Sequence, residues 1–157
     1  MRGRLAIVFA VWFSMRLLGQ SPPANNDDVA IVVNEKNSVN ELSMPDLRKI
    51  LAGERHNWPG GQPVKLVVRA PGTHERLVLL RVLHMSESEY KQYWISQVFR
   101  GEAQAEPVVL PSNGMQKEAL ASFPGGIALV EARDVKTPMK VLKIDGYLPG
   151  QPGYPLH

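Results

Sequence analysis

The chain has 157 residues, with 18 Lys and Arg against 15 Asp and Glu, and it contains no cysteine. That length fits one compact domain and excludes a large two-domain enzyme. The absence of cysteine excludes disulfide scaffolds, thiolate metal sites and cysteine nucleophiles. The formal net charge of +3 would suit a nucleic-acid-binding surface, so the positions of the basic residues decide what the charge means.

The amino-terminal segment has the layout of a secretory signal peptide, which we assign to residues 1–21. Arg2 and Arg4 precede an uncharged run from Leu5 to Met15, and Arg16 ends that run. The run is too short to cross a hydrocarbon core about 30 Å thick, so we expect no stable membrane span. A short uncleaved anchor and a buried first helix are the alternatives. No cysteine follows for a lipoprotein anchor, and we expect the protein in the periplasm or secreted.

Without Arg2, Arg4 and Arg16, the chain from residue 22 onward carries 15 Lys and Arg against 15 Asp and Glu. Basic and acidic residues are interspersed there, so we expect no nucleic-acid partner. Residues 22–28 are polar and rich in Pro and Asn, which predicts a linker. We place the folded domain at residues 29–145. Residues 146–157, with three Gly and three Pro, predict an irregular tail.

Strands and helices alternate along the folded part. Apolar, β-branched runs predict strands at residues 29–33, 64–69, 107–110, 127–131 and 139–144. Ser43, Thr73 and Ser86 are predicted helix caps, and a fourth helix is predicted from Gly114 to Phe123. The buried helix faces are expected to include Leu77, Leu80, Leu83, Tyr90, Trp94, Ile95, Val98, Met115, Ala119, Leu120 and Phe123. This pattern predicts an α/β lobe with a mixed, mostly parallel sheet of about five strands flanked by helices.

The segment from Arg69 to Thr73 is the strongest candidate for a binding site. An arginine ends a buried strand, Pro71-Gly72 predicts a turn, and Thr73 is placed to begin the next helix. The first N–H groups of a helix have no partner within it and attract anions. Arg69 would add a charged planar fork and Thr73 a hydroxyl donor. The alternative is structural: Thr73 only caps its helix and Arg69 pairs with a surface carboxylate.

Other chemistry has little support in the sequence. The four histidines (His56, His74, His84 and His157) are scattered without metal-ligand spacing, so we expect no metal site. Adjacent helix residues such as His74 and Glu75 diverge by about 100°, and no nucleophile is spaced to join them. No phosphate-binding glycine loop is present for a nucleotide. We therefore expect no catalytic residue and no cofactor.

Four motifs, in this order, resemble the phosphate-type substrate-binding proteins of ABC importers, in the form of a short single-lobe relative. The motifs span Ser43 to Gly53, Asn57 to Gly61, Val68 to Thr73, and Phe123 to Ala128. The resemblance implies one lobe of a periplasmic-binding-protein-like fold that recognises phosphate or a similar oxyanion without chemistry. It further implies that Arg69, Gly72, Thr73 and the backbone amides from His74 onward bind the oxyanion.

The sequence departs from that family at two points. Gly and Thr are typical of the two positions after the loop hydroxyl, where this chain has His74 and Glu75, and a carboxylate at Glu75 would repel an anion unless it points away. The second lobe that closes over the ligand is also missing. Its place would be taken by an ABC permease, an envelope complex or a second copy. The alternative function is an exported protein-interaction domain that keeps the lobe but has lost the ligand.

Overall fold

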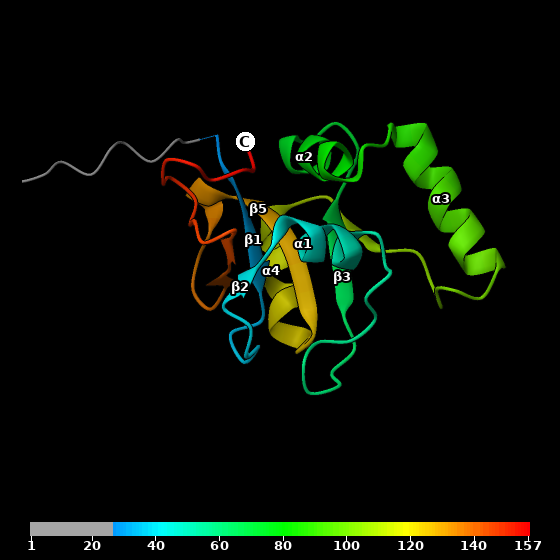
Figure 1. Cartoon of the computed structure of the whole chain (residues 1–157), viewed down its shortest axis with the longest axis horizontal. Helices are drawn as coiled ribbons and strands as arrows, with labels where there is room; N and C mark the ends of the chain where they lie inside the picture. Colours follow the sequence, from blue (N-terminus) through cyan, green and yellow to red (C-terminus); the bar gives the residue numbers. More distant parts are fainter. Residues whose placement is uncertain (1–26) are drawn as a thin grey trace, which may run out of the picture.

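The computed structural model describes residues 27–157, so the predicted signal peptide and most of the predicted linker lie outside the described residues. The helices lie close to their predicted ranges and begin after the predicted caps. Helices are interleaved with strands along the chain, as Figure 1 shows. The helices are α1 (Met44–Leu51), α2 (His74–Leu83), α3 (Glu87–Phe99), α4 (Asn113–Ser122) and the short 3₁₀ turn η1 (Ala132–Asp134). The strands are β1 (Val29–Val33), β2 (Glu41–Leu42), β3 (Lys65–Arg69), β4 (Val108–Leu110), β5 (Gly126–Glu131), β6 (Lys140–Val141) and β7 (Lys143–Ile144).

The main sheet has five strands in the order β4-β3-β5-β1-β6. β3 pairs in parallel with β4 and β5, whereas β1 pairs antiparallel with β5 and β6. Four of the five strands therefore share one direction, and β1 alone runs the other way. The predicted fold class, a mixed and mostly parallel sheet flanked by helices, is confirmed.

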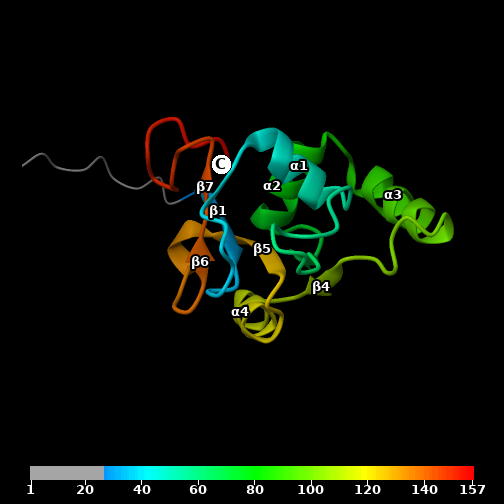
Figure 2. The ribbon, with the colours of Figure 1, turned by 60° about the horizontal axis from the view of Figure 1, so that its bottom comes forward.

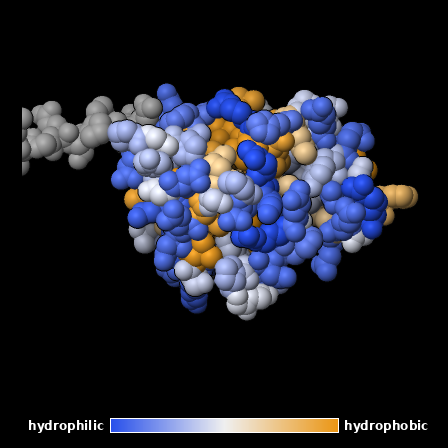
Figure 3. Space-filling model, viewed as in Figure 1, coloured by the Kyte–Doolittle hydropathy of each residue, from blue (hydrophilic) through white to orange (hydrophobic). Residues whose placement is uncertain are grey.

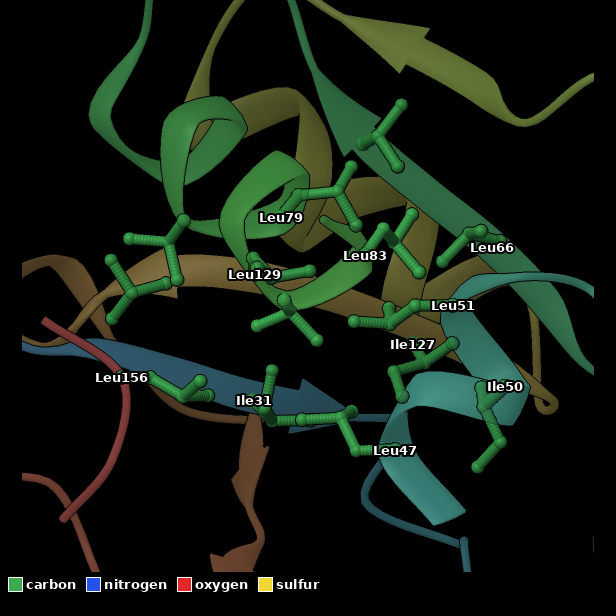
Figure 4. Close-up of a cluster of buried hydrophobic side chains, with 14 of the residues drawn as sticks. Ile31, Leu47, Ile50, Leu51, Leu66, Leu79, Leu83, Ile127, Leu129 and Leu156 are labelled. Atoms are coloured by element: carbon green, nitrogen blue, oxygen red, sulfur yellow. The ribbon is translucent and has the colours of Figure 1, made fainter. Parts of the chain in front are cut away.

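Helices cover both faces of this sheet, as expected for strands that are apolar on both sides. Figure 2 shows α1 and α2 on one side of the sheet and α4 on the other. Alternate residues of β1 enter separate cores: Ile31 joins the core beneath α1 and α2, and Val32 joins the core beneath α4. The larger core is drawn in Figure 4, where Leu47 and Leu51 of α1 meet Ile127 of β5. Each of these fully buried side chains contributes about 1.5–3 kcal/mol to folding.

α3 stands at the side of the molecule, away from the sheet (Figure 1). Its predicted capping box is confirmed: Ser86 Oγ accepts from the Glu89 N–H at 3.1 Å, and the Glu89 carboxylate accepts from the Ser86 N–H at 2.7 Å. Tyr90 and Trp94 are buried, but Ile95 and Val98 are exposed, so the predicted apolar face is wrong beyond Trp94. The reason is that the second half of α3 extends past the body of the domain.

Three other residues expected on buried helix faces are also exposed: Leu77, Met115 and Phe123. Leu77 lies on the outer side of α2, whose buried residues Val78, Leu79 and Leu80 face the core.

No helix in the described part of the chain is long and apolar enough to span a lipid bilayer. Figure 3 shows one face of the molecule, which is mostly hydrophilic, with apolar side chains gathered near the upper centre.

The predicted last strand, residues 139–144, divides into two. β6 pairs with β1 in the main sheet, while β7 pairs in parallel with β2, a two-residue strand that the sequence pattern did not reveal. Leu142 lies between them and is fully buried, and its N–H donates to the Ile31 carbonyl at 2.9 Å. The chain therefore changes partner at Leu142, a change that hydrophobicity alone does not show.

The tail of residues 146–157 contains no helix or strand, yet it completes the core. Leu156 is buried beside Ile31 (Figure 4), and the Val29 N–H donates to the Leu156 carbonyl at 2.9 Å. The hydroxyl of buried Tyr154 donates to the Val29 carbonyl at 2.7 Å. Burial raises the pKa of Tyr154, and the nearby Asp28 carboxylate raises it further. The tail thus packs against β1 and is hydrogen-bonded to Val29, the first residue of that strand.

Candidate functional site

The candidate site lies where the parallel strands β3, β4 and β5 end at one edge of the sheet. The chain passes from β3 into α2, from β4 into α4 and from β5 into η1. Open α/β sheets bind ligands outside the carboxyl ends of their strands. Two helices begin here, and each presents backbone N–H groups that have no partner within the helix. The edge is therefore suited to a small anion.

The turn between β3 and α2 is shaped by Gly72 and Thr73. Gly72 has a φ of 87°, a conformation that residues with a Cβ rarely adopt. Thr73 caps α2, as predicted: its Oγ accepts from the Arg76 N–H at 3.3 Å and donates to the Ala70 carbonyl at 2.9 Å. The hydroxyl hydrogen of Thr73 is thus engaged inside the turn.

Arg69 lies at the end of β3, on the face of the sheet that α4 covers. Its Nη1 donates to Asn113 Oδ1 at 2.8 Å, and Asn113 Nδ2 donates in turn to Asp134 Oδ2 at 2.7 Å. Arg69 forms no salt bridge with any residue between 27 and 157. Its Nε is buried and has no hydrogen-bond partner within the same range. The arginine thus contacts a neutral amide rather than the surface carboxylate of the structural alternative.

The start of α2 has an acidic neighbourhood. His74 Nδ1 lies 3.8 Å from Glu131 Oε1, and Glu131 also pairs with Arg133. Glu75, in the first turn of α2, is only 3% exposed. The protein's own carboxylates therefore already lie close to the N–H groups that the sequence assigned to an anion, and they oppose binding there.

Arg76 is a buried cation in α2 that sequence reasoning did not single out. Its guanidinium donates to the Glu87 carboxylate and lies 4.3 Å from the centre of the Tyr90 ring. Its Nη1 also donates to the Arg69 carbonyl at 3.4 Å. Burial raises the pKa of Tyr90 to about 12, although the Arg76 charge opposes that shift. With these partners, Arg76 joins α2 to α3 and is not available to a ligand.

Gln116 of α4 is the second residue that the sequence did not indicate. It is fully buried, and neither its Oε1 nor its Nε2 has a hydrogen-bond partner among residues 27–157. Asn113, Gln116 and Leu120 share one face of the helix, because residues three and four apart lie above one another. The sequence signal that could have identified Gln116 is its spacing of four residues from the apolar Leu120, on the face of α4 that points inward.

Two hollows of the described surface lie away from Arg69. A groove of about 630 Å³ is lined by Ile50, Lys65 and Trp94, at the amino end of β3, and a hollow of about 110 Å³ lies against Leu120 and Pro124. No group of three His, Cys, Asp or Glu side chains within residues 27–157 is placed to hold a metal. Arg69 lines neither of these two hollows.

Comparison with known proteins identifies the family. Residues 23–152 match the model of the PBP superfamily domain. The fold is similar to an ABC-type phosphate transport receptor from Vibrio cholerae, with a TM-score of 0.63 and 21% identity over 78% of this chain and 48% of the receptor. It is similar to PstS from Borrelia burgdorferi, with a TM-score of 0.59 and 18% identity over 78% of this chain and 49% of PstS.

A phosphate-binding protein from Stenotrophomonas maltophilia gives a TM-score of 0.56 and 18% identity over 78% of this chain and 40% of that protein. The chain thus spans about half the length of the solved structures it matches or less. These likenesses confirm the lobe fold that the sequence motifs implied, and the family match covers most of the chain. The protein belongs to the PBP superfamily.

Proposed function

We propose that the protein is a non-catalytic binding lobe for a small oxyanion, with phosphate as the first candidate. The observation that carries the proposal is Arg69, a half-buried cation at the carboxyl edge whose side chain donates to the neutral Asn113 side chain and forms no ion pair within residues 27–157. Arginine binds the oxygens of phosphate through two parallel N–H donors. The fold likeness to the phosphate transport receptor from Vibrio cholerae and to the phosphate-binding protein from Stenotrophomonas maltophilia adds support.

The affinity of the lobe alone is expected to be weak. Arg69 is half-exposed at the edge of the sheet, and Glu131 and Asp134 lie beside the groups that would hold the anion. Solvent screens charge interactions at such a surface. We expect a dissociation constant for phosphate of about 1 mM, which corresponds to about 4 kcal/mol of binding free energy.

The chain matches only about half the length of its solved relatives, which suggests that another protein surface completes the site. The relatives extend beyond the region that this chain covers. We propose that a partner covers the carboxyl edge and excludes water, which strengthens the electrostatic attraction for the anion. The candidate partners are an ABC permease, an envelope complex and a second copy of the chain.

We further propose that residues 1–21 direct export to the periplasm or to the medium, on the basis of their charge and hydropathy. Cell fractionation tests this: the full chain should be found outside the cytoplasm, and a chain that starts at residue 22 should remain inside. Equal distribution of both chains would refute export.

Thermal unfolding in phosphate tests the binding function. A ligand at ten times its dissociation constant stabilises the folded state by about 1.4 kcal/mol. We therefore expect about 10 mM phosphate to raise the melting temperature by about 3–6 °C relative to KCl of equal ionic strength. Arg69→Gln should abolish the rise, whereas Arg100→Gln, at the exposed arginine that directly follows α3, should leave it intact. A wild-type protein with no phosphate-specific rise up to about 50 mM would refute the proposal.

A further inference from the structure

Hydrogen-bonding atoms without partners are concentrated beneath the first turn of α4. Six buried side-chain nitrogen and oxygen atoms lack a partner within residues 27–157, and three of them belong to Arg69 and Gln116. Buried polar groups in folded proteins are nearly always paired, because each unpaired group lowers stability. A pair of residues that leaves three such atoms unpaired therefore needs an explanation.

The two residues lie on facing elements. Val67 of β3, Leu120 of α4 and Ala128 of β5 share one core, and alternation along β3 places Arg69 on the same face as Val67. A Cβ on Gly126 would lie 3.0 Å from Leu120, so Leu120 packs at the start of β5. The α4 face of the sheet thus carries Arg69 at one end and the Leu120 contact at the other.

The register brings Gln116 toward Arg69. Gln116 is four residues before Leu120, which corresponds to a rise of about 6 Å along α4. Two residues of a strand span a similar distance, so Gln116 lies level with Ala128, two residues after Gly126 in β5. Ala128 pairs with Val67, and Arg69 is two residues further along β3. Helical side chains lean toward the helix amino terminus. The Gln116 amide is therefore directed from the level of Val67 toward that of Arg69.

The unpaired atoms are complementary. Arg69 Nε carries one N–H donor, and Gln116 Oε1 is an acceptor. In this structure, the opposite end of the guanidinium is engaged, because Nη1 donates to Asn113. If the guanidinium moved so that Nη1 left Asn113 and Nε donated to Gln116, both Nη groups would be free to turn outward from the edge of the sheet.

The start of α4 has fewer nearby negative charges than the start of α2, so an anion is more favourably bound by the Nη groups at α4. The first turn of α4 contains no acidic residue, whereas the first turn of α2 contains Glu75, and Glu131 lies beside His74. The backbone N–H groups of Asn113 and Gly114, at the start of α4, have no partner within the helix. Asp134 is the carboxylate beside this turn, where it accepts from Asn113 Nδ2 at 2.7 Å, whereas the start of α2 has both Glu75 and Glu131.

We propose that Gln116 is a positioning residue for Arg69: its buried amide oxygen accepts from Nε, so that both Nη groups bind two oxygens of an oxyanion at the first turn of α4. The inference rests on the proposed function and adds to it the place of docking and the residue that orients the arginine. The ligand class is an oxyanion with two accessible oxygens on one face, of which inorganic phosphate is the probe.

Nuclear magnetic resonance of the ¹⁵N-labelled full chain, titrated with inorganic phosphate, tests the proposal. We expect saturable shifts at the Arg69 Nε–H, the Gln116 side-chain amide and the Gly114 N–H. Shifts confined to the N–H groups of residues 73–76 would overturn the proposal while phosphate binding stands. The absence of saturable shifts anywhere would overturn both this proposal and the proposed function.

Variants provide a second measurement. Gln116→Met keeps the side-chain volume and should weaken phosphate binding about tenfold, because Arg69 loses the acceptor that orients it. Gln92→Met, at an exposed glutamine of α3, is the matched control and should bind like the wild type. If Gln116→Met binds phosphate as tightly as the wild type while Arg69→Gln does not bind, Gln116 does not position the arginine.

Discussion

Gln116→Met should stabilise the folded protein even as it weakens binding. The Gln116 side chain is fully buried, and both ends of its amide lack a hydrogen-bond partner within residues 27–157. A buried polar group without a partner costs about 1–3 kcal/mol, and methionine fills a similar volume without polar hydrogen-bonding needs. We therefore expect the free energy of unfolding to rise by about 1–3 kcal/mol.

Urea denaturation followed by circular dichroism measures this change. The midpoint should rise while the m value stays unchanged, because the surface exposed on unfolding is the same. Gln92→Met on the exposed side of α3 should change the free energy of unfolding by less than about 0.5 kcal/mol. If Gln116→Met is less stable than the wild type, the amide has a partner in the folded protein, and the reasoning about unpaired atoms is wrong.

Three further predictions concern the framework that holds the site. Stability should fall as pH rises above 10, and Tyr90 should account for about 2 kcal/mol of the fall at pH 12, because an unfolded tyrosine ionises near pH 10 while Tyr90 holds its proton up to about 12. Tyr154, whose pKa is also raised by burial, adds to the fall. Unfolding free energies measured from pH 8 to 12 should fall less in Tyr90→Phe than in the wild type, and an equal fall would contradict the assignment. Trp58→Phe should cost about 1–3 kcal/mol in urea denaturation, because buried Nε1 donates to the Gly125 carbonyl at 2.9 Å, and an unchanged midpoint would exclude that bond. Gly125→Ala should cost about 3 kcal/mol or more, because a Cβ there would lie 1.8 Å from the Pro63 carbonyl oxygen, and near-wild-type thermal stability would show that the loop moves freely.

The fold could be predicted because local signals agreed with each other. Each cap at Ser43, Thr73 and Ser86 stands directly before a helix, and each accepts the hydrogen bond from three residues further on. The apolar run of β1 is buried at every position. Where tertiary context decided the outcome, prediction failed: Ile95 and Val98 fit a helical stripe, but nothing in the described chain covers that part of α3.

The site could be predicted only in part. The loop from Arg69 to Thr73 and its position before a helix follow from local sequence. Asn113 and Gln116 could not be connected to Arg69 in this way, because the contact joins residues 44 positions apart and depends on which face of β3 the arginine occupies. The Glu131 carboxylate beside His74 likewise depends on the order of strands in the sheet.

The central claim is that Arg69 binds an oxyanion at the carboxyl edge of the sheet, and isothermal titration with phosphate tests it most directly. At low ionic strength the folded protein should bind phosphate with a dissociation constant of about 1 mM, and Arg69→Gln should bind at least about tenfold more weakly with an unchanged circular dichroism spectrum. Equal binding by the wild type and Arg69→Gln, or no heat of binding from either, would contradict the claim.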